Sequence, residues 1–297
     1  MEQIIQIDPG AGPCFGVQRA INLAEKLLEK YGNLRCLDDL IHNYEELKRL
    51  ENRGLRIVTH CQLVEQKGKK LLLRAHGEPP STYRIAKKYG VELIDATCPI
   101  VKKLQNMVKV HSEQMADQNG QVIVFGDPNH AEINALRGYC KCEFHVVSSL
   151  EEVENLTINK PTVFFSQTTK YQSDYHRVIE AFKYRQYMEN LFEVSLTFFD
   201  SQCEHISRRD LELTDFIKDK DLLIFVGGKN SSNAKYLFNV GKQKVESAYF
   251  ISNPDELKVK WFKKGLKIGI SGATSTPIWL LEETRKRVEE LVFQSNA

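Results

Sequence analysis

The sequence has no long unbroken apolar run, no large excess of charge of either sign, and no cysteine pattern of the kind that builds a disulfide framework. None of its apolar stretches approaches the roughly 20 residues that a membrane-spanning helix needs. The first ten residues, MEQIIQIDPG, have an acidic second residue and an apolar segment that is too short for a signal peptide. We therefore expect a cytoplasmic protein that does not associate with membranes.

Two further absences narrow the choice of function. The formal net charge is only +2, and neither an arginine-rich arm nor an RNA-binding signature is present, which argues against a nucleic-acid partner. The cysteines number seven, an odd count, and include one closely spaced pair in CKC at 140–142. In a reducing compartment, cysteines at selected positions are better explained by metal binding or catalysis than by disulfides.

What the sequence does contain is a short pattern that occurs three times: an apolar strand, an aspartate, a turn, a cysteine and then a helical segment. The aspartate and cysteine of the three copies are Asp8 and Cys14, Asp95 and Cys98, and Asp200 and Cys203. A thiol just before a helix lies near the positive end of the helix dipole, which favours the thiolate. The copies lie about a hundred residues apart, which is a plausible domain size.

Five further segments run from an apolar stretch into a polar turn, and a helical pattern follows most of them. They begin at KLLLRAHGEPP, QVIVFGDPNHAE, TVFFSQTTKYQ, DLLIFVGGKNSSN and LKIGISGATSTP. Such alternation predicts an α/β fold of three pseudo-repeated domains, each a small, mostly parallel sheet flanked by helices. We expect domains at 1–97, 98–198 and 199–297, with the carboxyl ends of the strands directed at one central site.

Three thiolates from three such domains would fit a 4Fe-4S cluster. Such a cluster normally takes four cysteines, so one iron would keep an open position for a substrate. The wide spacing of the cysteines argues against a ferredoxin-like electron carrier. The alternative is that the three cysteines are simply small buried residues. Because all three occupy the same structural position, this alternative is the weaker interpretation.

Two polar turns before helices predict an anion site. One carries Ser231, Ser232 and Asn233, and the other carries Ser275 ahead of Pro277. Hydroxyls, an amide and unpaired backbone N–H groups at a helix start bind phosphate-like ligands, although the same residues also serve as ordinary N-caps. The spacing of GGKNSSN is not that of a Walker A loop.

His42, His76 and His130 fall at turns of the same kind, and a protonated histidine can donate to a phosphate oxygen. A single histidine of this kind is usually just solvated, so the prediction depends on there being three. Glu132 follows His130 and could deliver protons, or could simply stabilise the first turn of a helix. Thr168 could orient a substrate hydroxyl, or could act as an N-cap.

Taken together in this order, five short motifs make the chain resemble one family almost from end to end. They are HN at 42–43, AHG at 75–77, DATCP at 95–99, SQTT at 166–169 and KNSSN at 229–233. The family is that of the 4-hydroxy-3-methylbut-2-enyl diphosphate reductases, the iron–sulfur enzymes that end the non-mevalonate isoprenoid pathway.

The resemblance implies a 4Fe-4S cluster held by Cys14, Cys98 and Cys203. It implies that Glu132 and Thr168 lie beside the allylic hydroxyl of the substrate, with Gln167 lining the same region. The products would be isopentenyl and dimethylallyl diphosphates, and the electron donor a ferredoxin or a flavodoxin. The implied ligands of the substrate diphosphate are His42, His76, His130, Ser231, Ser232, Asn233 and Ser275.

The chain departs from the usual family pattern at Ala131, at Phe15, in EHISRR after Cys203 and at the end of AHGEPP, without losing a reactive side chain. Three other functions remain open from the residues alone. One is a quinolinate-synthase-like enzyme with a phosphate-bearing substrate, and another is an iron or redox sensor without turnover. The third is a zinc-stabilised binding protein, for which a set of three cysteines would be incomplete.

Overall fold

The protein is described by a computed structural model that covers residues 4–229 and 231–296, except the side chains of Ser232 and Asn296. The chain forms two compact units, each described here by itself. The first comprises Met1–Leu34, Asp39–Arg56 and Arg208–Ala297, and the second comprises Arg35–Asp38 and Ile57–Ser207.

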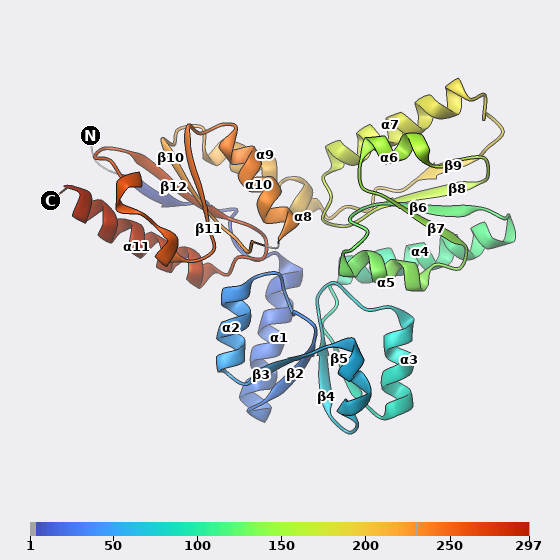
Figure 1. Cartoon of the computed structure of the whole chain (residues 1–297), viewed down its shortest axis with the longest axis horizontal. Helices are drawn as coiled ribbons and strands as arrows, with labels where there is room; N and C mark the ends of the chain where they lie inside the picture. Colours follow the sequence, from blue (N-terminus) through green and yellow to red (C-terminus); the bar gives the residue numbers. More distant parts are fainter. Residues whose placement is uncertain (1–3, 230, 297) are drawn as a thin grey trace. The chain divides into compact units, whose positions relative to one another are not determined.

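Three four-stranded sheets form the framework (Figure 1). Sheet A has the order β1 (Ile4–Ile7), β12 (Lys267–Gly272), β10 (Leu222–Val226), β11 (Ser247–Ile251). Sheet B has the order β3 (Leu55–Val58), β2 (Leu34–Leu37), β4 (Lys70–Leu73), β5 (Glu92–Asp95). Sheet C has the order β7 (Glu143–Val147), β6 (Gln121–Phe125), β8 (Thr162–Ser166), β9 (Leu196–Phe198). Parallel pairing runs through all of sheets A and C and through β2, β4 and β5, which confirms the predicted fold class.

Helices follow most of the strands, as expected for crossover connections between parallel strands. The α-helices are α1 (Phe15–Tyr31), α2 (Tyr44–Asn52), α3 (Pro80–Tyr89), α4 (Pro99–Asp117), α5 (Ala131–Tyr139), α6 (Leu150–Asn155), α7 (Gln172–Met188), α8 (Glu204–Ser207), α9 (Arg209–Phe216), α10 (Ser232–Lys242) and α11 (Ile278–Asn296). Three short 3₁₀ helices are η1 (His60–Gln66), η2 (Pro254–Glu256) and η3 (Val259–Trp261). Within the described residues, no helix has the length and apolar character needed to cross a membrane.

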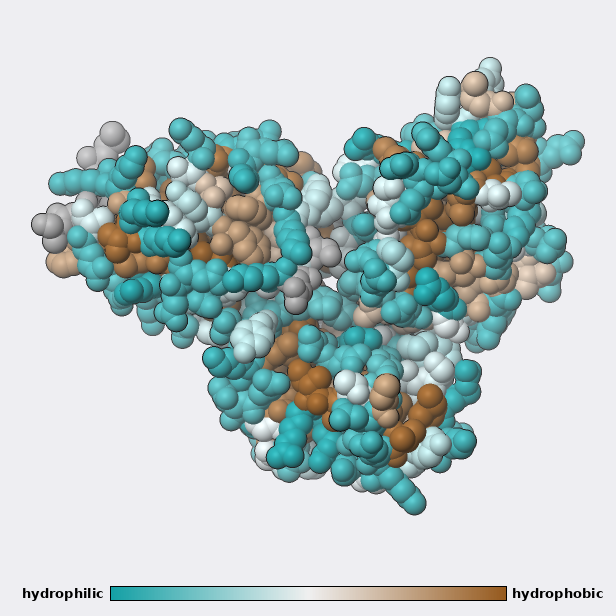
Figure 2. Space-filling view, viewed as in Figure 1, coloured by the Kyte–Doolittle hydropathy of each residue, from teal (hydrophilic) through white to brown (hydrophobic). Residues whose placement is uncertain are grey.

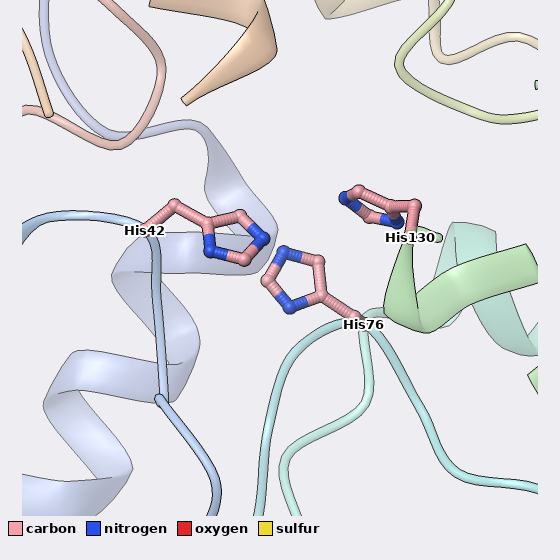
Figure 3. Close-up of side chains that lie close together, drawn as sticks. All are labelled: His42, His76 and His130. Carbon is pink, nitrogen blue, oxygen red and sulfur yellow. The ribbon is translucent and has the colours of Figure 1, made fainter. Parts of the chain in front are cut away.

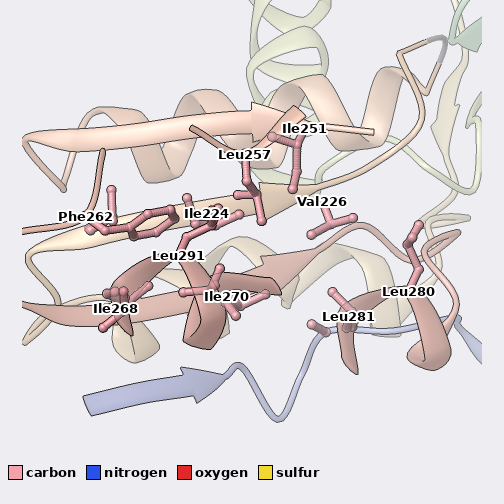
Figure 4. Packing of buried hydrophobic residues seen from close by; sticks show 14 residues of the cluster. Ile224, Val226, Ile251, Leu257, Phe262, Ile268, Ile270, Leu280, Leu281 and Leu291 are labelled. Carbon is pink, nitrogen blue, oxygen red and sulfur yellow. The ribbon is translucent and has the colours of Figure 1, made fainter. Parts of the chain in front are cut away.

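Sheet A is covered on both faces, with α11 along one and α9 and α10 along the other (Figure 1). Helices cover both faces of the sheet because alternate apolar residues of β10 point to opposite faces. Ile224 and Val226 belong to the core that α11 completes through Leu281 and Leu291, drawn in Figure 4. A strand that is buried on both faces reads as a continuous apolar run, as LLIFV does here.

Sheet C is built in the same way within the second unit. Val122 and Val124 of β6 pack with α4 and α5, whereas Ile123 and Phe125 pack with α6 and α7. The apolar residues are thereby largely enclosed, and in Figure 2 hydrophilic residues cover most of the visible face, with hydrophobic ones in smaller separate areas.

One pair of neighbouring strands joins segments that the sequence-based boundaries assign to different domains. Strand β1, from the first predicted domain, lies beside β12, from the third, with Ile4 opposite Lys267 and Ile7 opposite Ile270. The boundaries at 97 and 198 stay predictions. The sheet order shows that the two ends of the chain contribute to one sheet.

A buried ion pair anchors the turn between β1 and the first cysteine. The Arg209 guanidinium, only 2% exposed, donates to the carboxylate of Asp8 and to the hydroxyl of Ser271, and Ser271 Oγ also donates to Asp8 Oδ2 at 2.7 Å. Removing one partner of a buried pair leaves the other charge uncompensated, which typically costs about 3–5 kcal/mol.

We therefore expect Arg209→Ala to lower the free energy of unfolding by about 3 kcal/mol or more. The neighbouring Arg208, which is exposed, gives the matched control, and Arg208→Ala should change stability by less than about 0.5 kcal/mol. Denaturant titration of the two variants checks this. Equal stabilities would show that the pair does not anchor the turn.

Candidate active site

The three predicted cluster cysteines occupy equivalent positions, each directly before a helix and after a strand of a parallel sheet. Cys14 is the N-cap of α1 and Cys98 is the N-cap of α4, and neither side chain makes a capping hydrogen bond. Cys203 directly precedes the short helix α8. All three thiols thus lie at helix starts, and Cys203 differs in that the amides of His205 and Ile206 hydrogen-bond its sulfur.

The backbone amide of each cysteine is fixed to one of the predicted polar turns. The amide of Cys14 donates to the carbonyl oxygen of Thr274 (3.0 Å), and that of Cys98 donates to Ala75 (2.9 Å). The amide of Cys203 donates to the carbonyl oxygen of Thr168 (2.9 Å). The repeated pattern in the sequence therefore corresponds to a repeated backbone contact in the fold.

The turns before the first two cysteines also share a conformation, and the third differs. Asp8 accepts from the amide of Gly10 and Asp95 accepts from the amide of Thr97, each two residues on (2.9 and 2.8 Å). Asp200 is largely exposed, and the neighbouring Ser201 instead ties the turn to β8 by exchanging hydrogen bonds with the backbone of Ser166.

Glu132 and Thr168 form a buried pair within the second unit. The Thr168 hydroxyl donates to Glu132 Oε2 at 2.7 Å, and the Thr168 amide donates to Oε1 at 2.8 Å. The Glu132 side chain is 1% exposed and Thr168 is 4% exposed. Since the Thr168 carbonyl accepts from Cys203, one residue joins the buried carboxyl to a predicted cluster ligand.

Burial gives this carboxyl an unusual proton affinity. It raises the pKa of Glu132 to about 7, against the two hydrogen bonds from Thr168, which act to lower it. A carboxyl of this kind is part protonated near neutral pH, so it can hold and release a proton where an exposed glutamate is fully ionised.

His76 and His130 also lie close together in the second unit (Figure 3). Their ring centroids are 5.2 Å apart, with the rings edge to face. His130 caps α5, and its Nδ1 accepts from the amide of Glu132 at 3.1 Å, so the proton of the neutral ring lies on Nε2. Gly77 has a φ of +80°, and a Cβ there would lie 2.2 Å from the Gln105 amide, so the AHG turn requires glycine after His76.

His42, also labelled in Figure 3, lies in the first unit on the loop before α2. Its carbonyl oxygen accepts from Ser275 Oγ at 3.4 Å. A Cβ on Gly228 would lie 2.6 Å from the same carbonyl, so the GG turn after β10 packs directly against this loop. His42 is thereby held beside the two turns that were predicted to bind an anion.

Those two turns also contact each other. Asn233 Nδ2 donates to Thr274 Oγ1 at 2.9 Å, and Ser231 Oγ accepts from the amide of Ala234 at 3.2 Å as the N-cap of α10. The capping interpretation of Ser231 is therefore correct, and it leaves the hydroxyl proton available for an anion. The side chain of Ser232 lies outside the described part of the chain.

A family model described as "LytB protein" matches residues 5–289. The chain belongs to the LytB family. A curated protein of Bacteroides thetaiotaomicron, named 4-hydroxy-3-methylbut-2-enyl diphosphate reductase, is 37% identical over 97% of this chain and 98% of its own length. A protein of the same name from Phocaeicola vulgatus is 38% identical over 96% of this chain and 98% of its own length.

Solved structures agree with the LytB assignment. The E-1-hydroxy-2-methyl-but-2-enyl-4-diphosphate reductase of Plasmodium falciparum superposes with a TM-score of 0.82 at 28% identity, covering 98% of this chain and 88% of that one. A second structure, described as the terminal enzyme of the non-mevalonate pathway, gives 0.71 at 30% identity, over 97% of this chain and 100% of that one. The predicted family and the predicted reductase class are thereby confirmed.

The places where this LytB chain departs from the usual pattern have ordinary structural roles. Ala131 is the buried first residue of α5, and Phe15 is the exposed first residue of α1. Pro79 and Pro80 provide the N-cap and first position of α3, where proline suits the helix start. Arg209, the last residue of EHISRR, is the buried partner of Asp8.

One expectation about charge needs correction for the third cysteine of this LytB chain. Burial raises the pKa of the Cys203 thiol, and the charges of Cys98 and Glu132 act in the same direction. Burial outweighs the amides of His205 and Ile206 at the start of α8, whose hydrogen bonds act to lower this pKa. Burial therefore disfavours the thiolate at Cys203, and a nearby positive charge would favour it.

A buried carboxylate that no local sequence signal indicated lies behind the His76 turn. Glu78 is fully buried, and its Oε2 lies 2.6 Å from His60 Nε2, while His60 Nδ1 lies 3.0 Å from Asp38. The hydrogen bond with Glu78 raises the pKa of His60, against the effect of burial. His60 therefore belongs to a polar network that supports this turn.

Proposed function

We propose that this chain reduces 4-hydroxy-3-methylbut-2-enyl diphosphate to isopentenyl diphosphate and dimethylallyl diphosphate, the final step of the non-mevalonate isoprenoid pathway. Family membership and the names of its relatives support the reaction. The observation that carries the proposal is the path from the buried Glu132 carboxyl through Thr168 to the amide of Cys203. It supports a role for Glu132 as a proton carrier close to a metal-ligand candidate.

The cluster that the family requires would be held by Cys14, Cys98 and Cys203. The described chain fits such a group in two respects. All three thiols are free of disulfides and precede helices, and a bound metal's positive charge would offset the burial that raises the pKa of Cys203. A bound 4Fe-4S cluster would supply the electrons, one at a time, and an open iron that acts as a Lewis acid.

The proposed ligands of the substrate diphosphate are hydroxyls, an amide, histidine rings and a helix N-terminus. In the first unit, the start of α10 and the turn after β12 provide hydroxyls, an amide and a helix N-terminus. In the second, His76 and His130 provide ring N–H donors. The full set that we propose is His42, His76, His130, Ser231, Ser232, Asn233 and Ser275. Its role is chiefly to orient the allylic hydroxyl.

Glu132 and Thr168 would supply the proton for the leaving oxygen. The reaction breaks the allylic C–O bond, takes up two electrons and two protons, releases one water molecule and forms one C–H bond. The Glu132 carboxyl would give its proton to the departing oxygen, and Thr168 Oγ, bonded to Oε2, would keep that carboxyl in place. Gln167 lies in the same turn, where its Oε1 accepts from the amide of Asp127 at 2.9 Å.

The decisive experiment is an anaerobic preparation with iron and sulfide counting, followed by an assay with a reduced dye and the allylic diphosphate. We expect about four irons per chain and formation of both products. A cluster without turnover would favour an iron or redox sensor, and turnover of only another phosphate-bearing substrate would favour a quinolinate-synthase-like enzyme. The cytoplasmic location and the ferredoxin or flavodoxin donor stay predictions.

The proposed contacts of Asn233 and Ser231 with the diphosphate lead to a separate prediction. We expect Asn233→Ala and Ser231→Ala each to raise KM about tenfold or more with a smaller effect on kcat, since a hydrogen bond to a charged group contributes about 1.5–3 kcal/mol. Asn239→Ala, on the exposed side of the same helix, is the matched control and should leave KM unchanged. Steady-state kinetics decide the point. Unchanged KM in both test variants would remove these residues from the diphosphate site.

A further inference from the structure

Cys140 and Cys142 form a thiol pair that the proposed reaction does not use. Cys140 is the C-cap residue of α5, its amide donating to Leu136 at 3.1 Å, and Cys142 directly precedes β7. Their Sγ atoms lie 3.8 Å apart, and both side chains are half-buried. The pair therefore lies at the opposite end of α5 from His130 and Glu132.

The backbone around the pair is held firmly. The amide of Lys141, between the two cysteines, donates to the hydroxyl of Ser112 at 3.0 Å, and Ser112 is fully buried on α4. Both cysteines pack at the edge of the apolar core between sheet C and its helices. The two thiols consequently stay close to each other without a covalent bond.

The proton affinities of the two thiols differ in a way that suits one reactive thiolate. A hydrogen bond with Cys142 lowers the pKa of Cys140 to about 6, while burial acts in the opposite direction. The same hydrogen bond raises the pKa of Cys142. The pair thus shares one proton at neutral pH, and a thiolate is the form that attacks a disulfide.

We propose that Cys140 and Cys142 form a reversible dithiol–disulfide couple that exchanges with low-molecular-weight disulfides. Disulfide formation needs the two sulfurs, now 3.8 Å apart, to approach to about 2.05 Å, which rotation of the two side chains can provide. A soft-metal site is less consistent with the structure. Among the described residues no third His, Cys, Asp or Glu joins the pair in a metal-binding group.

The small disulfide is the only oxidant that the exchange needs. The Cys140 thiolate attacks one sulfur of a small disulfide, RSSR, forming a mixed disulfide and releasing RS⁻. Cys142 then loses its proton and attacks Sγ of Cys140, which forms the intramolecular disulfide and releases a second RS⁻. The protein pair is oxidised by two electrons and RSSR is reduced to two thiols, one of which takes the proton of Cys142 and the other a proton from solvent.

The test treats the anaerobic, cluster-loaded enzyme with glutathione disulfide, blocks the remaining thiols and digests the product with trypsin. Cleavage after Lys141 separates the two cysteines into different peptides, which stay joined only if a disulfide links them. We expect the joined pair in the wild type, and its loss after treatment with excess reduced glutathione. Cys142→Ser should instead accumulate the glutathione adduct on Cys140, to a level about tenfold above the wild type.

Two controls separate this result from general thiol reactivity. Cys61, which is exposed, should form only a slow, unresolved glutathione adduct in every variant. Cys140→Ser and Cys142→Ser should keep the reductase activity of the reduced wild type, because neither thiol belongs to the proposed site. Stable adducts on Cys140 in the wild type, or an unmodified pair while Cys61 is modified, would overturn the proposal.

Discussion

Glu132→Gln is expected to lower kcat about 10²- to 10⁴-fold while leaving the iron content unchanged. This range is typical for the loss of a positioned general acid. Glutamine keeps the shape of the side chain and can still bond to the amide and hydroxyl of Thr168, so the fold should persist. Anaerobic kinetics with iron counting on the same sample measure both quantities. Normal turnover by a fully loaded Glu132→Gln enzyme would show that Glu132 does not carry the proton.

Thr168 offers the matched pair of variants for this prediction. Thr168→Ser keeps the hydroxyl that donates to Glu132 Oε2 and should stay near wild-type activity. Thr168→Val keeps the shape but loses the hydroxyl, and should lower kcat. If serine and valine were equally damaging, the threonine would matter through packing and not through its hydrogen bond.

The raised pKa of Glu132 also predicts a pH dependence. In the wild type, kcat should fall as the pH rises through about 7, because the carboxyl loses the proton that it must donate, and Glu132→Gln should lack this limb. Stability should respond in the same direction. The unfolded chain loses this proton near pH 4.5 and the folded one near 7, so the free energy of unfolding falls across that interval.

The size of that stability change follows from the two pKa values. The free energy of unfolding should fall by about 3 kcal/mol between pH 4.5 and 7, and this group should change it no further above pH 7. Glu132→Gln removes this change, so the variant should gain thermal stability relative to the wild type as the pH is raised from 5 to 8. Parallel pH dependences of Tm in the two proteins would show that the carboxyl is not buried in its neutral form.

Cys98→Ser and Cys203→Ser are each expected to abolish the reductase activity by loss of the cluster. The iron content should fall from about four atoms per chain towards zero, because serine is a poor ligand for iron in place of a thiolate. Iron and sulfide analysis, together with the visible absorption of the cluster, measures this directly. Cys61→Ser, at an exposed position, is the matched control and should keep both iron and activity.

One result would contradict the assignment of Cys203 as a cluster ligand. If Cys203→Ser retained full iron while Cys61→Ser lost it, the cluster would not be where the repeated pattern predicts. The backbone contact between Cys203 and Thr168 does not involve the thiol, so a serine there should leave the local fold intact. Loss of iron can therefore be attributed to the ligand.

The local part of this architecture could be predicted from the sequence. The strand, aspartate, turn and cysteine pattern placed Cys14, Cys98 and Cys203 before helices, because apolar runs and turn residues act over a few neighbouring positions. The parallel sheets followed from the same alternation. The pairing of β1 with β12 could not be predicted, since no local signal in either segment specifies its partner strand.

The details that sequence alone could not supply all depend on burial. The sequence left Glu132 open between a proton carrier and a helix-dipole residue, and its 1% exposure and its two bonds from Thr168 favour the proton carrier. Arg209 was noted only within an unusual stretch, yet it is the buried partner of Asp8. Burial also reversed the expectation for the Cys203 thiol, because desolvation outweighs the hydrogen bonds from the amides at the start of α8.

The commitment of all three cysteine amides to carbonyl oxygens has an electronic consequence. Hydrogen bonds from nearby amides to cluster sulfur are one of the means by which a protein tunes an iron–sulfur reduction potential. The amides of Cys14, Cys98 and Cys203 already donate to Thr274, Ala75 and Thr168, so none of them can ease the addition of negative charge to sulfur. Any amide hydrogen bonds to the cluster sulfurs would therefore come from other residues, such as His205 and Ile206, whose amides act to lower the pKa of the Cys203 thiol.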